Sequence, residues 1–136
     1  GYYPENNKNG KLLQISKHKC SGIYAVYAGK SIEEKKCCIR KLLYIGEAQN
    51  VVEERLTDKH ECYECWEEQL KDGEKLYFCI ADVYAADRER AEAALIYKTC
   101  PPCNEQCTQS FSYDTTTIES DGEHKFIPGS FTVLKK

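Results

Sequence analysis

Two tripeptides, Gly22-Ile23-Tyr24 and Tyr44-Ile45-Gly46, constrain the fold of this chain more than any other feature. They lie in short apolar segments over residues 21–28 and 37–45. Alternating side chains in the first segment and the apolar end of the second are typical of β-strands. We expect a turn over 29–31, a loop or wide hairpin tip over 32–36, and antiparallel pairing, because the connection is short. The pattern therefore predicts a hairpin with one tyrosine on each strand.

The sequence pattern after this hairpin predicts mostly helices. Asn50 and Glu53 form a capping-box pattern, which starts a helix over 51–57. A second helix is expected over 61–70, a third strand over 75–83, and a third helix over 88–98 with Asp87 as its N-cap. The order β-β-α-α-β-α predicts an α+β fold, a small three-stranded antiparallel sheet flanked by helices. Residues 110–120 fit a strand or a loop, and 125–134 fit an extra C-terminal edge strand.

Composition favours a single soluble domain. The 136 residues are 41% hydrophobic and 30% charged, as in globular proteins that bury a core. No apolar run approaches the roughly 20 residues that span a bilayer, so we expect no membrane contact. We assign residues 1–20 to an N-terminal extension, 21–106 to the main domain and 107–136 to a C-terminal extension packed on the same domain.

The chain contains nine cysteines, an odd number. The long periodic segments favour a conventional core with mostly reduced thiols, and hence an intracellular, cytoplasmic protein. Structural zinc is the alternative, because two pairs have the local spacing of zinc ligands. Against zinc, the first pair lies in a predicted helix and the fifth cysteine gives one ligand too many. These five residues are Cys62, Cys65, Cys100, Cys103 and Cys107.

Two charged side chains border apolar helix faces. Val51 and Val52 precede Arg55 by four and three residues, so the three share one face of the first predicted helix. In the last helix, Leu95 and Ile96 follow Glu92 at the same spacings. Periodicity therefore directs a positive and a negative charge toward the sheet.

Burying an unpaired charge costs several kcal/mol, so these two side chains need partners. One alternative is a buried salt bridge between Arg55 and Glu92, or between Glu92 and Arg88 along the helix. The other is a cleft that both charges line beside the hydroxyl groups of Tyr24 and Tyr44. A carboxylate, a cation and proton acceptors in one cleft are what phosphodiester cleavage requires.

The ordered set of residues resembles the GIY-YIG nuclease superfamily. After the two tripeptides the chain has, in the order used by that family, Arg55, His60, Glu92 and Asn104. The resemblance implies a metal-dependent endonuclease that hydrolyses phosphodiester bonds in DNA rather than RNA.

The resemblance also implies roles for these residues. Glu92 would bind one divalent ion, Mg²⁺ or Mn²⁺, and Arg55 would hold the scissile phosphate. Either Tyr24 or Tyr44 would activate or orient the attacking water. His60 matches a histidine of restriction-type and structure-specific members and could lower the tyrosine pKa or accept its proton. Asn104 would fix the site from the loop after the last helix.

The chain departs from the family at several points. Glu47 follows the second glycine where the excision-repair branch carries lysine, so Lys36 or Lys41 would have to replace that cation. No separate DNA-recognition domain fits, so specificity would come from insertions, a homodimer or a partner protein, or be absent. The alternative function is a catalytically weak nucleic-acid-binding module of the same fold that acts with a partner protein.

The net charge of −3 gives no overall attraction to nucleic acid, so binding requires a local basic surface. The segment between the two tripeptides is the densest candidate, and we expect it to contact DNA near the cleft. Its residues are Lys35, Lys36, Arg40 and Lys41. The Lys17-His18-Lys19 cluster is the second candidate.

Overall fold

The computed structural model describes residues 2–5, 12, 21–34, 36–49, 55–104, 111–122 and 124–135. A four-stranded antiparallel sheet with strand order β1-β4-β2-β3 is its main element, and a separate two-stranded sheet contains β5 and β6. The elements are β1 (Tyr3–Pro4), β2 (Gly22–Glu33), β3 (Lys36–Ala48), α1 (Tyr63–Glu68), β4 (Lys75–Asp82), α2 (Ala85–Thr99), β5 (Thr116–Glu119) and β6 (Ser130–Val133). The predicted α+β class is confirmed, and the expected three-stranded sheet gains β1 as a fourth strand.

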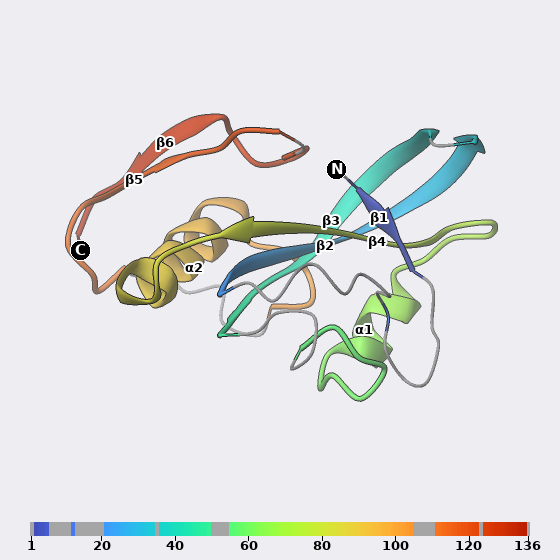
Figure 1. Ribbon diagram of the computed structural model, residues 1–136, viewed down its shortest axis with the longest axis horizontal. Helices are drawn as coiled ribbons and strands as arrows, with labels where there is room; N and C mark the ends of the chain where they lie inside the picture. The colour runs from blue at the N-terminus through green and yellow to red at the C-terminus, as the bar shows by residue number, and fades with distance from the viewer. Residues whose placement is uncertain are drawn as a thin grey trace.

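The sheet separates two hydrophobic cores. On one face, Tyr24 and Val26 of β2 pack in a cluster that includes Trp66 of α1. On the other face, Ile23 and Ala25 belong to a cluster that includes residues of α2 and β6. Figure 1 shows α1 and the β5–β6 hairpin on opposite sides of the sheet. Because β2 is paired on both edges and covered on both faces, its residues from 22 to 29 are all buried.

The β2–β3 hairpin is longer than the sequence predicts. The expected turn over 29–31 is wrong, since these residues continue β2, and the strands extend to Glu33 and from Lys36. Gly29 pairs with Ile39 on one side and with Lys75 on the other. A Cβ atom at Gly29 would lie 2.7 Å from the Cys38 carbonyl oxygen, so this glycine permits close strand approach instead of a turn.

The helices differ from the predictions mainly at their ends. α2 begins at Ala85 with Tyr84 as its N-cap, so the assignment of Asp87 as the cap is wrong. Asp87 instead lies in the first turn, where it pairs with Arg90. α1 covers 63–68 of the predicted 61–70. Of the helix predicted over 51–57, residues 50–54 lie outside the described part, and residues 55–57 are not α-helical.

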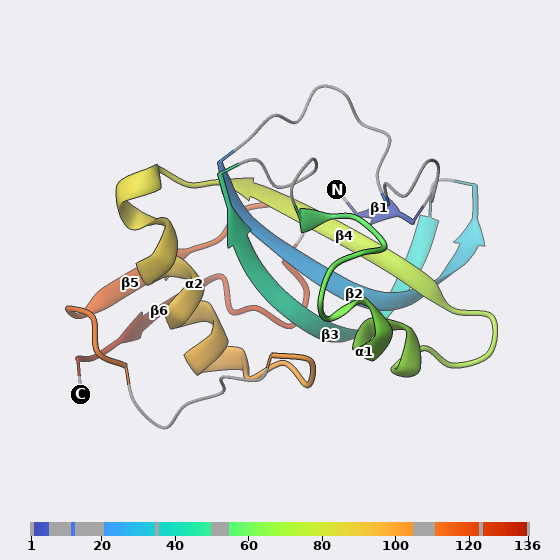
Figure 2. The ribbon, with the colours of Figure 1, turned by 90° about the horizontal axis from the view of Figure 1, so that it is seen from below.

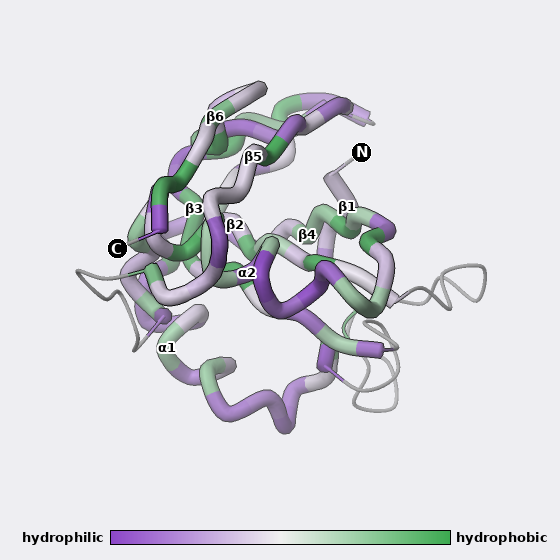
Figure 3. Tube along the Cα trace, turned by 90° about the vertical axis from the view of Figure 1, so that its left-hand side faces the viewer, coloured by the Kyte–Doolittle hydropathy of each residue, from purple (hydrophilic) through white to green (hydrophobic). Residues whose placement is uncertain are grey.

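The C-terminal part forms a hairpin against α2. A strand, β6, forms within the predicted 125–134, but it pairs with β5 of the preceding Thr-rich segment in a separate sheet and is not an edge strand of the main sheet. Exposed and buried residues alternate along β6, and its hydropathy alternates with them (Figure 3). Phe131 and Val133 face inward to the cluster that contains Leu95 of α2. None of the helices in the described ranges is long and apolar enough to cross a membrane.

Candidate active site

A cleft of about 430 Å³ lies where the end of β3 meets α2, and it contains four of the six predicted site residues. Tyr24 comes from β2, Tyr44 from β3, Arg55 from the segment before α1, and Glu92 from α2. The two charges that periodicity directed toward the sheet both line this cleft, although residues 55–57 are not α-helical and Val51 and Val52 lie outside the described part. The lining also includes residues that sequence reasoning did not assign to the site: Glu47, Ala48, Gln49 and Arg88.

The glycines of the two tripeptides have a steric role. Gly46 pairs with Tyr24 across the hairpin, and a Cβ atom there would lie 2.3 Å from the Tyr24 hydroxyl oxygen. At Gly22, a Cβ atom would lie 1.9 Å from the carbonyl oxygen of Ala81 in β4. Neither position has room for a side chain. The first glycine brings β2 and β4 together, and the second leaves space for the tyrosine ring.

Gly46→Ala is therefore expected to displace Tyr24 and to lower the free energy of unfolding by about 1–3 kcal/mol, the usual cost of overpacking. Urea denaturation would measure the change. Gly129→Ala is the matched control, because a Cβ atom there meets only His124, at 3.8 Å. Equal urea midpoints for the two variants would contradict the steric role.

The buried Tyr24 hydroxyl contacts His60 and Arg55. Its oxygen lies 2.8 Å from His60 Nε2 and accepts the Arg55 Nε–H at 3.3 Å. His60 Nδ1 accepts the backbone N–H of Cys62 at 2.9 Å, and its Nε2 also lies 3.0 Å from Arg55 Nη2, which can only donate. Trp66 packs against the imidazole with the ring centroids 4.4 Å apart. These contacts hold Tyr24 in place at the cleft.

The pKa values show which groups are charged near neutral pH. Burial raises the pKa of Tyr24, against the lowering effect of Arg55, and raises the pKa of Tyr44 to about 12. Burial and the positive charge of Arg55 lower the pKa of His60 to about 4. The imidazole is therefore neutral at pH 7, and both tyrosines carry their protons.

The two cleft arginines pair with carboxylates other than Glu92. Arg55 binds Glu61, and this hydrogen bond lowers the pKa of Glu61 to about 2. Arg88 binds Glu47. Neither salt bridge considered for Glu92, with Arg55 or with Arg88, forms within the described residues.

Glu92 is suited to bind a cation. Burial, reinforced by the negative charge of Glu47, raises its pKa to about 7, because the cleft does not compensate the charge of its carboxylate. Mg²⁺ is commonly held by one or two carboxylates plus waters and substrate phosphates, so a single glutamate fits this ion. No group of three potential ligands was found in the described part of the chain.

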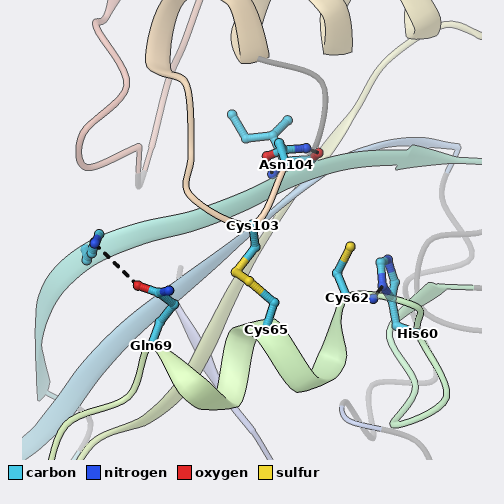
Figure 4. The surroundings of a disulfide bond; sticks show 8 residues. His60, Cys62, Cys65, Gln69, Cys103 and Asn104 are labelled. Atoms are coloured by element: carbon cyan, nitrogen blue, oxygen red, sulfur yellow. Dashed lines mark hydrogen bonds between the residues drawn. A yellow bond between two sulfur atoms is a disulfide. The ribbon is translucent and has the colours of Figure 1, made fainter.

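Asn104 stands outside the cleft and holds the strand that carries Tyr44. Its side chain accepts the N–H of Ile45 at 2.9 Å and donates to the Ile45 carbonyl at 2.8 Å. The backbone N–H of Cys103 donates to Leu43 at 3.0 Å, on the other side of Tyr44. Because β3 is the edge strand, residues 103–104 satisfy backbone groups that the sheet leaves open (Figure 4).

A disulfide between Cys65 of α1 and Cys103 joins the His60 side of the site to this segment (Figure 4). The expectation of mostly reduced thiols is therefore wrong for these residues, and Cys100 is disulfide-bonded as well. The bond also removes two members of the alternative zinc set as thiolate ligands. Cys62 is not disulfide-bonded in the part of the chain that the structure describes, and Cys107 lies outside that part.

The predicted basic segment lies mostly away from the cleft. Lys36 is at the hairpin tip, eight residues before Tyr44 on β3, which corresponds to about 26 Å along the strand. Figure 2 shows this tip and α2 at opposite ends of the sheet, so the expected proximity to the cleft is wrong. Arg40 makes two hydrogen bonds to the Glu74 carboxylate, and Lys41 contacts Gln69 at 3.4 Å. Lys35 and the cluster at residues 17–19 lie outside the described part.

Comparison of the chain with protein-family models, curated proteins and solved structures finds no match. The resemblance to GIY-YIG nucleases therefore depends on the tripeptides, the order of the candidate residues and their geometry. Arg88 and Glu47 could have been found from sequence only through weak signals. Arg88 is four residues before Glu92 on one helix face, and Glu47 directly follows the second tripeptide.

Proposed function

We propose that this chain is a metal-dependent endonuclease of the GIY-YIG type that hydrolyses phosphodiester bonds in DNA. The observation that carries the proposal is the cleft itself, in which four segments distant in sequence contribute Tyr24, Tyr44, Arg55 and Glu92. A structural role for these charges would pair Arg55 with Glu92. Both instead line a solvent-accessible cleft.

Each residue would have a separate role in the hydrolysis. Glu92 would hold Mg²⁺ or Mn²⁺, and the bound ion supplies Lewis acidity for phosphodiester hydrolysis. Arg55, fixed by Tyr24 and Glu61, would direct its remaining N–H groups to the scissile phosphate. Tyr44 is half-buried, whereas Tyr24 is fully buried and held by hydrogen bonds to Arg55 and His60. We therefore assign orientation of the attacking water to Tyr44 and assign Tyr24 to positioning Arg55.

The catalytically weak binding module remains the second candidate. Two observations favour it: the net charge of −3 and the pairing of each cleft arginine with a carboxylate. DNA rather than RNA, and a homodimer or partner protein that adds specificity, remain part of the proposal. Cytoplasmic localisation also remains a prediction, which the Cys65–Cys103 disulfide opposes, because disulfides persist mainly in oxidising compartments.

Incubation of the purified chain with supercoiled plasmid tests the two functions. Each reaction contains Mg²⁺ or Mn²⁺, with and without excess chelator. Nicking or linearisation that the chelator abolishes is the expected result. Binding of DNA without cleavage by either ion would favour the binding module, and neither binding nor cleavage would contradict both functions.

Arg55→Lys is expected to reduce the single-turnover cleavage rate by roughly 100-fold, because lysine cannot reproduce the planar fork that binds Tyr24 and phosphate together. DNA affinity, measured in chelator, should fall much less. Arg40→Lys is the matched control, since Arg40 pairs with Glu74 outside the cleft lining. If affinity and rate fell by the same factor, Arg55 would anchor the DNA backbone without a specific transition-state role.

A further inference from the structure

Arg88 lines the cleft but lies outside both tripeptides. It extends from α2 to the end of β3, where its Nε group donates to the Glu47 carboxylate. Its Nη1 group donates to the Ser21 hydroxyl at 2.7 Å. The side chain is only 19% exposed, so the guanidinium is held in one place by groups from two other segments.

Part of this guanidinium has no partner in the described part of the chain, and Arg88 lines the cleft. Its Nη2 group has no hydrogen-bond partner among the residues that the structure describes. Arg88 and Glu92 lie one helical turn apart, and both line the cleft together with Arg55. An arginine fixed through Nε and Nη1, with Nη2 unpaired, is suited to receive an anion without losing side-chain entropy on binding.

The charges of the cleft indicate how many anions it can hold. Its charged lining residues are Arg55 and Arg88, which are positive, and Glu47 and Glu92, which are negative when ionised. These four charges cancel. A divalent ion at Glu92 would therefore leave two positive charges, which balance two phosphodiester groups.

We propose that Arg88, positioned by Glu47 and Ser21, binds a second phosphate of the substrate, adjacent to the scissile one. The inference rests on the proposed function and deepens it, because it makes the substrate a polynucleotide with at least two consecutive phosphates. A phosphodiester with a single phosphate lacks the group that Arg88 recognises.

Two substrates separate the inference from the proposed function. One is a DNA oligonucleotide, and the other is bis(p-nitrophenyl) phosphate, which has one phosphate. Arg88→Gln should lower kcat/KM on the oligonucleotide by about ten- to a hundredfold, the usual range for a charge-assisted hydrogen bond. The loss on the single-phosphate diester should be at least tenfold smaller. For Arg88→Gln, the slope of log affinity for duplex DNA against log salt concentration should be flatter than that of wild type by about 0.9.

Two further variants make the test specific. Arg90→Gln is the control on the same helix, because Arg90 pairs with Asp87 and does not line the cleft. Glu47→Lys combined with Arg88→Gln returns a cation to the same place and should restore part of the oligonucleotide rate. A urea denaturation curve for each variant measures its folded fraction at the assay conditions.

The outcomes are distinct. A wild-type chain that cleaves neither substrate contradicts the proposed function, and the inference fails with it. Wild-type cleavage of both, with equal losses for Arg88→Gln on the two substrates, overturns the inference alone. Absence of rescue by the Glu47→Lys exchange in a folded protein would also contradict it, because a phosphate contact requires only a cation at that place.

Discussion

Glu92→Gln is expected to slow DNA cleavage by roughly a thousandfold or more, because the amide removes the charge that holds the divalent ion and its Lewis acidity. Plasmid cleavage in Mg²⁺ would measure the loss. Glu89→Gln is the matched control, since Glu89 is an exposed residue on the same helix and does not line the cleft. Wild-type turnover in the Glu92 variant would exclude the assigned role.

The same substitution should change stability in a direction that distinguishes a metal site from a structural salt bridge. The pKa of Glu92 is raised from 4.5 to about 7 in the folded protein, so the folded state binds more protons than the unfolded state between these pH values. Stability then decreases as pH rises through this window. Glutamine does not ionise, so the variant should lose this decrease and be more stable than wild type at pH 8 without metal.

Urea denaturation at pH 5 and pH 8 in chelator would measure this difference. Added Mg²⁺ should stabilise wild type at pH 8, because it binds only the folded state, and should leave Glu92→Gln unchanged. A variant less stable than wild type at pH 8 would instead show that the Glu92 carboxylate takes part in a stabilising ion pair.

Periodicity and local signals predicted the elements that depend on local sequence. The alternation in β2 and the apolar end of β3 have local causes, and these two strands were predicted. β1 was missed because two residues carry no periodic signal, and β1 forms only through its pairing with β4. The turn expected at Gly29 failed for a similar reason, since pairing on both sides overrides the preference of glycine for turns.

In the candidate site, too, the sequence predicted what depends on local pattern and missed what depends on long-range contacts. The apolar faces of two helical patterns indicated that Arg55 and Glu92 approach the sheet, although residues 55–57 are not α-helical. The partners of Arg55 and Arg88 are Glu61 and Glu47, and this choice depends on the path of the chain between elements. Cysteine spacing suggested zinc, whereas the observed bond joins one member of each pair, and connectivity of that kind cannot be deduced from sequence.

Replacement of both Cys65 and Cys103 by alanine is expected to lower the free energy of unfolding by up to about 4 kcal/mol. The two residues are 38 positions apart, and the estimate is the loop entropy that a cross-link of this length removes from the unfolded chain. Urea denaturation without reductant would measure the loss. Cys38→Ala is the control, because Cys38 is an exposed free thiol.

Activity should fall together with stability in the double cysteine variant. Residues 103–104 hold β3 on both sides of Tyr44, and the disulfide joins them to α1, which follows the His60 that is hydrogen-bonded to Tyr24. Without the bond, Tyr24 and Tyr44 are held less firmly. Cleavage should therefore slow even without urea, where the variant is folded. Reductant would also cleave the disulfide of Cys100, so the variant isolates the effect better than reduction does. An unchanged free energy of unfolding without reductant would show that the cross-link does not stabilise the folded protein.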